Sequence, residues 1–240
     1  MMATSEAPVA SSERIYAIGD IHGRLDLLGR AIAAIRRDVS DHGPAVLTVT
    51  VGDYIDRGPQ SRGVLGRLVE NPFPTPYVAL KGNHEAMLET FLADPESGSF
   101  WIKQGGHETL QSYGVRLGRL PASADFAETA RDLHAALPPS HFDFLRSLKT
   151  SITRGRYFFC HAGVRPGVPL DRQSEEDLLW IRDAFLTSRE DFGKIVVHGH
   201  TPAVEPEVRA NRIGIDTGAF ASGRLTCVVL DEAGHRFLAI

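Results

Sequence analysis

Side chains that bind metals recur in five loops of this sequence, and each loop directly follows an apolar run. They are Asp20, His22, Asp53, Asn83, His161 and His200. Oxygen and imidazole ligands without a thiolate suit divalent metals such as Mn, Fe or Zn. A single such residue in a loop usually has no role, but five loops that all carry this chemistry predict a shared metal site.

The position of Asp53 indicates how two metals could share this site. Asp53 follows the middle one of the first three predicted strands. Two dications about 3.5–4 Å apart repel each other strongly, so they need a carboxylate that binds both. A hydroxide held between such ions can attack phosphorus directly, without a covalent enzyme intermediate. The sequence therefore predicts a two-metal phosphoesterase in which Asp53 bridges the ions.

The first half of the chain alternates apolar strands, glycine-containing loops and amphipathic helices. The predicted strands are residues 14–18, 45–51 and 77–80. Asp20 and Asp53 are 33 residues apart, and Asp53 and Asn83 are 30 residues apart, each about one βαβ unit of ~30 residues. Right-handed βαβ units build a parallel sheet whose loops after the strands share one edge. We therefore expect these loops to lie side by side.

The second half of the chain departs from this rhythm. Residues 94–148 lack strand-like runs and are predicted to form a helical insertion, with helices at residues 108–113, 124–137 and 142–148. Strands are expected again at residues 157–160 and 195–197, each leading to a histidine. Further short strands at residues 212–215, 225–230 and 236–240 have no helical pattern between them. These strands predict a second, mixed sheet that packs on the first.

Composition and charge limit the partners and the compartment. The formal net charge of −4 gives no attraction to nucleic acid or to an anionic membrane. Cys160 and Cys227 are too few for a disulfide framework, and no apolar run approaches the ~20 residues of a membrane span. Residues 1–13 resemble no signal peptide. We expect a cytoplasmic α/β protein with a disordered tail at residues 1–13 and one domain over residues 14–240; the oligomeric state stays open.

The candidate ligands belong to five sequence blocks in a recurring order. The blocks are GDIHGR (Gly19–Arg24), GDYIDRGPQS (Gly52–Ser61), GNHE (Gly82–Glu85), CHAG (Cys160–Gly163) and HGHTP (His198–Pro202). Together they resemble the phosphoprotein phosphatase family of metallophosphoesterases, most of all the small bacterial and phage-type serine/threonine protein phosphatases. The resemblance implies a calcineurin-like sandwich of two mixed β-sheets flanked by helices, with a helical insertion at about residues 94–148.

The resemblance also implies a role for each matching residue. The first metal would be held by Asp20, His22 and Asp53, and the second by Asp53, Asn83, His161 and His200. His84 would protonate the departing alkoxide, and Asp56 would orient His84 through its other ring nitrogen. Arg57 and Arg182, together with Asn83, would bind the phosphate oxygens. Mn²⁺ is the expected metal, with Fe and Zn as alternatives.

Two neighbouring features are predicted to be structural. His198 precedes His200 by two residues, but the family pattern uses only the histidine of GHT as a ligand. Pro202 occupies the position where many other metallophosphoesterases have a second histidine. The DTGA block, Asp216 to Ala219, also resembles a family block and is assigned no part in the chemistry.

Three functions fit the resemblance to different degrees. Symmetrical dinucleoside polyphosphate hydrolases share the GDxHG and GNH blocks, but their second block tends towards VARG, whereas this chain has IDRG with Asp56. That difference favours a phosphomonoesterase acting on phosphoserine and phosphothreonine of proteins, with the preference for phosphotyrosine left open. A non-catalytic scaffold would typically have lost metal ligands, and this sequence retains every one.

Overall fold

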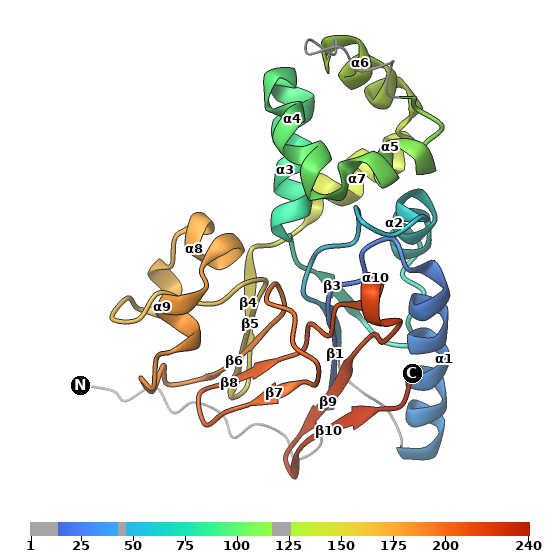
Figure 1. Ribbon diagram of the computed structural model, residues 1–240. Helices are drawn as coiled ribbons and strands as arrows, with labels where there is room; N and C mark the ends of the chain where they lie inside the picture. Colours follow the sequence, from blue (N-terminus) through green and yellow to red (C-terminus); the bar gives the residue numbers. More distant parts are fainter. Residues whose placement is uncertain (1–13, 43–46, 117–125) are drawn as a thin grey trace, which may run out of the picture.

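The first β-sheet carries the three predicted βα units. The computed structural model describes residues 14–42, 47–116 and 126–240, so the predicted tail lies outside the described residues. The parallel strands of this first sheet are β1 (Ile15–Ile18), β2 (Leu47–Thr50) and β3 (Tyr77–Ala79). The sheet also contains β9 (Cys227–Asp231) and β10 (Gly234–Leu238), and its strand order is β10-β9-β1-β2-β3. The predicted parallel arrangement of the first three strands is confirmed (Figure 1).

A second five-stranded sheet lies beside the first. Its strands are β4 (Ser151–Arg154), β5 (Tyr157–Cys160), β6 (Ile195–His198), β7 (Glu207–Val208) and β8 (Arg212–Gly214), in the order β4-β5-β6-β8-β7. The pairs β5–β6 and β6–β8 are parallel, and the two outer pairs are antiparallel. The loops after β5 and β6, which carry His161 and His200, therefore leave the sheet at one edge.

The prediction that the C-terminal strands all belong to the second sheet is wrong. Only β8 does so, because β9 pairs antiparallel with β1, and β10 pairs with β9. The short helix α10 (Ala219–Ser222) also separates β8 from β9. Sequence periodicity shows which residues are extended but not which strand edge they will meet. The strands β4 and β7 were not predicted, because most of their residues are exposed or half-buried and lack an apolar run.

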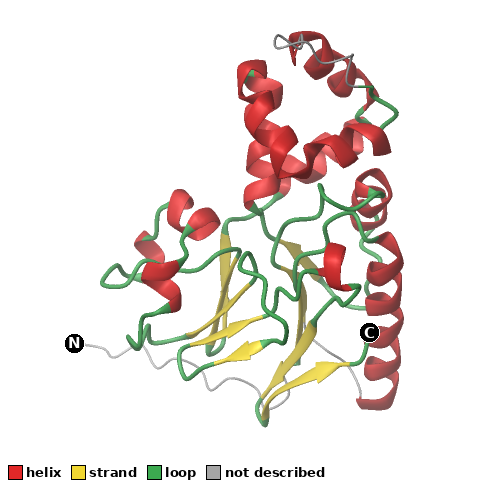
Figure 2. Ribbon diagram, viewed as in Figure 1, coloured by secondary structure: helices red, strands yellow, loops and turns green. Residues whose placement is uncertain are grey.

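Apolar side chains hold the two sheets face to face. Ala17 and Val49 of the first sheet share one buried cluster with Phe159, Val197 and Ile213 of the second. Alternate residues of the strands point to the outer faces. There helices α1 (Leu25–His42) and α2 (Ser61–Val69) cover the first sheet, and α8 (Glu175–Trp180) and α9 (Asp183–Leu186) cover the second (Figures 1 and 2). No described helix is long and apolar enough to cross a membrane.

A group of helices between β3 and β4 projects from the sandwich above the first sheet (Figures 1 and 2). It comprises α3 (Asn83–Ala93), η1 (Pro95–Ser97), α4 (Gly98–Trp101), the π-helical η2 (Ile102–Gly106), α5 (His107–Ser112), α6 (Phe126–Ala136) and α7 (Pro139–Ser147). The helices predicted at residues 108–113 and 142–148 correspond to α5 and α7, within a few residues. The start of the helix predicted at 124–137 lies outside the described residues.

Candidate metal centre

The candidate ligands converge where strands of both sheets end. Asp20 and His22 follow β1, Asp53 follows β2, Asn83 begins α3 after β3, and His161 and His200 follow β5 and β6. All six side chains are buried. Parallel strands deliver the loops that follow them to a common edge, and the face-to-face packing of the sheets brings the two edges together.

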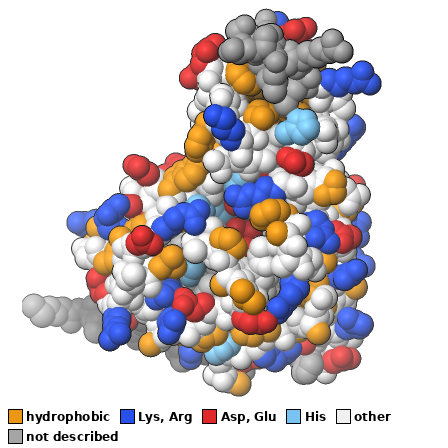
Figure 3. Space-filling view, viewed as in Figure 1, with side chains coloured by type: hydrophobic (Ala, Val, Ile, Leu, Met, Phe, Trp, Pro, Cys, Tyr) orange, Lys and Arg blue, Asp and Glu red, His pale blue; other side chains and the backbone are white. Residues whose placement is uncertain are grey.

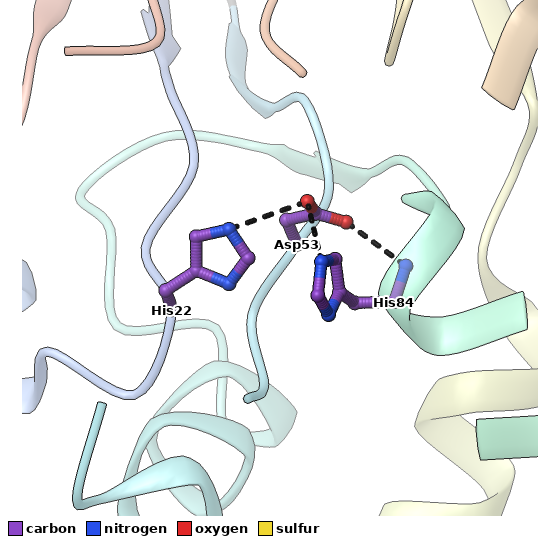
Figure 4. Close-up of side chains that lie close together, drawn as sticks. All are labelled: His22, Asp53 and His84. Carbon is purple, nitrogen blue, oxygen red and sulfur yellow. Dashed lines mark hydrogen bonds and ion pairs between the residues drawn. The ribbon is translucent and has the colours of Figure 1, made fainter. Parts of the chain in front are cut away.

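One group of possible ligands consists of His22, Asp53 and His84, whose ligand atoms lie within 4.8 Å of one another. His22 Nε2 lies 3.4 Å from Asp53 Oδ2, and His84 Nε2 lies 3.8 Å from the same oxygen. Figure 4 shows both rings directed at the carboxylate, His22 from a loop and His84 from the start of α3. The structure thus brings the predicted acid, His84, to the same carboxylate oxygen as the predicted ligand His22.

A second group lies on the other side of the Asp53 carboxylate. Asp20, Asp53 and His161 also have ligand atoms within 4.8 Å of one another, and His161 Nε2 is 3.4 Å from Asp53 Oδ1. Asn83 Oδ1 lies 2.8 Å from both His161 Nε2 and His200 Nδ1. Each oxygen of Asp53 therefore faces a different group of ligands, which is the geometry that a bridging carboxylate needs.

Hydrogen bonds determine which nitrogen of two rings is free to bind metal. His22 Nδ1 donates to the carbonyl of Ile55 at 2.8 Å, and His161 Nδ1 donates to the carbonyl of Val51 at 2.9 Å. A carbonyl only accepts, so in each neutral ring Nε2 is left with its lone pair. Each Nε2 lies 3.4 Å from an oxygen of Asp53, and Nε2 of His22 also accepts from Arg57. A cation between an Nε2 lone pair and the carboxylate would be attracted by both.

The two buried carboxylates of Asp20 and Asp53 differ in their partners. Asp20 Oδ1 is buried and has no hydrogen-bond partner in the described part of the chain. Burial raises the pKa of Asp20 well above its usual value, and the negative charges of Asp216 and Asp53 raise it further. Burial would also raise the pKa of Asp53, but the surrounding histidines, His161 foremost, lower it. This donor set of oxygens and imidazoles fits a pair of divalent cations.

The imidazoles around Asp53 are held in the form that binds metal. Burial lowers the pKa of His22 to about 3 and that of His200 to about 2, and Asp53 opposes the shift at both. Burial also lowers the pKa of His161. A metal ligand must be the neutral imidazole, and these rings stay neutral at physiological pH.

Strained backbone is concentrated in these loops. Of the six described residues other than glycine with positive φ, five are His22, Asp53, Asp56, Arg57 and His200. Such conformations cost free energy and persist where the surrounding structure enforces them, often at functional sites. Glycines allow the backbone of these loops to approach the carboxylates closely. A Cβ on Gly82 would lie 2.1 Å from Asp53 Oδ1, and one on Gly199 would lie 1.9 Å from Asp20 Oδ1.

His84 forms a buried pair with Asp56. Its Nδ1 donates to Asp56 Oδ2 at 2.7 Å, so its Nε2 is the nitrogen that faces the ligand groups. Burial lowers the pKa of His84, but Asp53 and the hydrogen bond to Asp56 outweigh this effect, and the pKa lies above its usual value. A histidine that keeps its proton near neutral pH can donate it to a leaving group.

The two predicted phosphate-binding arginines lie on opposite sides of the centre. Arg57 is half-buried, and its guanidinium donates to His22 Nε2 at 3.0 Å. Arg182 is exposed, and its positive charge helps to lower the pKa of both His161 and His200. Histidine, acidic and basic side chains gather at the middle of the face seen in Figure 3, below the projecting helices.

His198 does not join either group of ligands. Its Nδ1 lies 3.0 Å from the carbonyl of Gly199, and its ring packs edge-on against Phe185. Its Nε2 is buried without a hydrogen-bond partner among the described residues, and it faces the backbone of Gly214 rather than Asp53. These contacts are those of a side chain packed inside the second sheet.

Residues outside the predicted set also contact the site. Asp216, predicted to be structural, helps to raise the pKa of Asp20. Phe220 on α10 packs edge-on against His22, with the Arg57 guanidinium 5.0 Å from its ring centre. The DTGA block was a usable signal for Asp216, but no local pattern distinguishes Phe220 from an ordinary surface aromatic residue.

Comparison with known proteins agrees with this geometry. The sequence model of the family described as calcineurin-like phosphoesterase matches residues 13–219. The chain belongs to this family. The ligand groups around Asp53 fit the divalent metals that calcineurin-like phosphoesterases use, and the predicted family and fold are confirmed.

Similar members of the calcineurin-like phosphoesterases carry more than one activity in their names. Serine/threonine-protein phosphatase 1 of Salmonella typhimurium is 31% identical over 217 residues, 88% of this chain and 89% of that protein. The asymmetrical bis(5'-nucleosyl)-tetraphosphatase PrpE of Anoxybacillus flavithermus is 24% identical over 236 residues, 90% of this chain and 89% of that protein. A crystal structure provisionally assigned as a diadenosine tetraphosphatase has a TM-score of 0.66 at 22% identity, covering 97% of this chain and 95% of the other, which shows a shared fold.

Proposed function

We propose that this metallophosphoesterase is a phosphomonoesterase that removes phosphate from phosphoserine and phosphothreonine of proteins. The observation that carries this proposal is the 2.7 Å hydrogen bond between His84 and the fully buried Asp56. A serine or threonine alkoxide is strongly basic and leaves readily only when it receives a proton, so its hydrolysis needs a positioned acid. The serine/threonine phosphatase relative at 31% identity supports the same choice.

Two divalent cations, which we expect to be Mn²⁺, would occupy the two sides of Asp53. The family pattern assigns Asp20, His22 and Asp53 to one of them, and Asp53, Asn83, His161 and His200 to the other. In this structure the ligand atoms of Asp20 group with those of Asp53 and His161 rather than with His22. When bound, the cations would neutralise phosphate oxygens and acidify the attacking water. The same oxygen and imidazole ligands also suit Fe and Zn.

His84 would act as the general acid. The bond between phosphorus and the seryl oxygen breaks, that oxygen takes the proton from His84 Nε2, and water contributes the new oxygen of the phosphate product. His84 is then a neutral imidazole that must regain its proton before the next cycle. Asp56, bonded to Nδ1, fixes the orientation of the ring and stabilises its protonated form.

Arg57 and Arg182 would bind the phosphate oxygens from two sides, together with the Asn83 side chain. The planar guanidinium groups can each donate two parallel hydrogen bonds to a phosphate. Arg182 is exposed, and the one hydrogen bond of its side chain to the described part of the chain is a 3.5 Å contact with Thr201 Oγ1, so it can rotate towards a substrate. The pair would orient the ester bond towards His84.

Parallel assays on phosphopeptides and dinucleoside polyphosphates test the proposal. We expect the purified protein with Mn²⁺ to release phosphate from phosphoserine and phosphothreonine peptides with a higher kcat/KM than it shows on diadenosine tetraphosphate. The Asp53→Asn variant, purified in parallel, should lose activity on every substrate, which excludes a contaminating phosphatase. Far faster cleavage of diadenosine tetraphosphate than of the peptides would make the proposal wrong.

The second candidate function is hydrolysis of dinucleoside tetraphosphates. It is favoured by the bis(5'-nucleosyl)-tetraphosphatase relative at 24% identity. That relative is named as an asymmetrical hydrolase, whereas the hydrolases that share the GDxHG and GNH blocks are symmetrical. A nucleotide leaves through a weakly basic phosphate oxygen, so this reaction gains little from an acid. The Asp56–His84 pair would then contribute little to the rate, and for this reason the monoesterase is our first choice.

A further inference from the structure

The Asp56 carboxylate is enclosed by hydrogen-bond donors from the projecting helices. Besides His84 Nδ1, it accepts from Trp101 Nε1 at 2.9 Å and from Thr109 Oγ1 at 2.6 Å. Asp56 and Thr109 are fully buried, and Trp101 is almost so. Trp101 ends α4 and Thr109 lies in α5, so two of the three side-chain donors to this carboxylate come from a segment that supplies no metal ligand.

The same segment also holds the backbone of the Asp56 loop. The Asp56 amide donates to Thr109 Oγ1 at 2.9 Å, and the Arg57 amide donates to the carbonyl of Gly105 at 3.0 Å. Asp56 and Arg57 have φ values of 68° and 66°, a region that side chains other than glycine adopt at a cost. Gly105 lies so close that a Cβ on it would be 2.7 Å from the Arg57 amide nitrogen.

We propose that residues 98–112, which contain α4, η2 and α5, act as a clamp that positions the catalytic acid. Trp101 and Thr109 are positioning residues: they fix the carboxylate of Asp56 so that Oδ2 meets His84 Nδ1, and Thr109 together with Gly105 keeps the loop in its strained conformation. The proposal rests on the proposed function, because a positioned acid matters only for a basic leaving group. Buried polar groups with complete hydrogen bonding specify one geometry.

Thr109 is the residue on which to test the clamp. Thr109→Val keeps the shape and removes the hydroxyl, whereas Thr109→Ser keeps the hydroxyl and serves as the conservative rescue. Thr75→Val is the matched control, because Thr75 Oγ1 is also buried and bonds another hydroxyl, Thr48 Oγ1, at 2.6 Å. That pair lies at the start of β2 and β3, at the sheet edge away from Asp53.

The first readout is the dependence of kcat/KM on the leaving group. We expect Thr109→Val to lower kcat/KM on a phosphoserine peptide by about 10-fold or more, as substitutions behind a functional residue typically do. The kcat/KM on p-nitrophenyl phosphate should stay nearly unchanged. Thr109→Ser should restore most of the loss, and Thr75→Val should affect both substrates equally. A merely structural role would lower both activities together, and that result would overturn the proposal.

The second readout needs no substrate. A histidine N–H bonded to a buried carboxylate gives a far-downfield proton NMR signal, which can be assigned to His84 by its loss in His84→Asn. In the Zn²⁺-loaded protein, which is diamagnetic, Thr109→Val should shift or broaden this signal, and Thr75→Val should not. An unmoved signal would refute the clamp even if the phosphatase activity is real. A shifted signal would support the clamp even if the preferred substrate proves to be a dinucleoside polyphosphate.

Trp101→Phe provides an independent variant. It removes the indole N–H but keeps an aromatic ring against Phe91, with which Trp101 stacks at 4.8 Å between ring centres. The clamp predicts the same selective loss on the phosphoserine peptide and a change in the His84 signal. If Trp101→Phe and Thr109→Val both fold and neither changes the leaving-group dependence, residues 98–112 do not position the acid.

Discussion

At the scale of single residues, the site depends on which atom of each ring is available. His22 and His161 commit Nδ1 to backbone carbonyls and present Nε2 to Asp53. His84 commits Nδ1 to Asp56 instead. A ring bonded to a carbonyl remains a neutral ligand, whereas a ring bonded to a carboxylate is stabilised with its second proton. For these three rings the partner of Nδ1 separates candidate ligand from candidate acid, whereas His200 directs Nδ1 itself towards Asn83.

The role of His84 predicts a dependence on the leaving group. His84→Asn should lower kcat on a phosphoserine peptide by about 10²-fold or more, since general acid catalysis typically contributes ~10²–10⁴-fold. The loss on p-nitrophenyl phosphate, whose leaving group scarcely needs a proton, should be much smaller. Steady-state kinetics on both substrates measures this, with the exposed His235→Asn as the control. Equal losses on both substrates would argue against the acid role.

The buried His198 predicts a dependence of stability on pH. Burial lowers its pKa to about 4, whereas an unfolded histidine titrates near ~6.5. Between these values the unfolded state binds the extra proton, so His198 contributes stability above pH ~6.5 that is lost as the pH falls towards 4. Urea denaturation in EDTA should show the wild-type advantage over His198→Asn shrinking by about 1.4 kcal/mol per pH unit below 6.5. A constant difference would show that His198 does not stay neutral.

At the scale of elements, helix α3 connects the first sheet to the site. Glu85 in its first turn reaches back and accepts hydrogen bonds from the amides of Gly82 and Asp53, both at 2.9 Å, and from Tyr54 at 2.8 Å. The His84 amide in turn donates to Asp53 Oδ1 at 3.1 Å. The amino end of a helix stabilises nearby negative charge, so α3 both anchors the Asp53 loop and favours its ionised carboxylate.

This anchoring predicts a large effect for Glu85→Gln. The new amide group would face backbone donors that now meet an oxygen, and a buried donor left without an acceptor costs about 1–3 kcal/mol. We expect the free energy of unfolding to fall by at least about 2 kcal/mol and the affinity for Mn²⁺ to fall with it. Urea denaturation and calorimetric titration measure these changes.

Glu89→Gln on the same helix is the control for that comparison. Glu89 pairs with Lys81 at 2.8 Å, but its side chain is 38% exposed, and exposed ion pairs contribute only about 0–1 kcal/mol. If Glu85→Gln proves as mild as Glu89→Gln, Glu85 does not hold the Asp53 loop.

At the scale of the whole molecule, the candidate ligands come from both sheets. Asp20, His22 and Asp53 follow strands of the first sheet, and His161 and His200 follow strands of the second. The sheets also share an apolar core, but at the site they meet through buried carboxylate, amide and imidazole groups. Cations bound there would join the two halves of the sandwich, so metal binding should be linked to the stability of the folded chain.

Removal of metal should therefore lower the melting temperature. A ligand at 100 times its Kd stabilises the folded state by about 2.7 kcal/mol, and for a chain of this size 1 kcal/mol corresponds to about 2–4 °C. Two cations should then raise the Tm by roughly 10–20 °C. Differential scanning calorimetry in EDTA, and again after addition of excess Mn²⁺, tests this. An unchanged Tm under both conditions would contradict the metal centre and revive a non-catalytic scaffold.

Short-range sequence patterns were sufficient to predict many of the strands and the candidate ligands that follow them. The strands before Asp20, Asp53, Asn83, His161 and His200 could be predicted because buried parallel strands are continuous apolar runs, and the spacing of about one βαβ unit placed three loops at one sheet edge. The confirmed family followed from five blocks in order. Asp20 and His200 illustrate why this works: each candidate ligand lies within a few residues of its own strand.

Contacts between distant segments were decided only by the tertiary structure. The pairing of β9 with β1 depends on which strand edge is left open, and no periodicity records that. The hydrogen bond from Thr109 to Asp56 spans 53 residues, and Thr109 has the composition and spacing of any helical threonine. The sequence determined which side chains could bind metal and phosphate. Only the packing of helices and sheets decided which buried partners would hold them, because such partners meet in space and not along the chain.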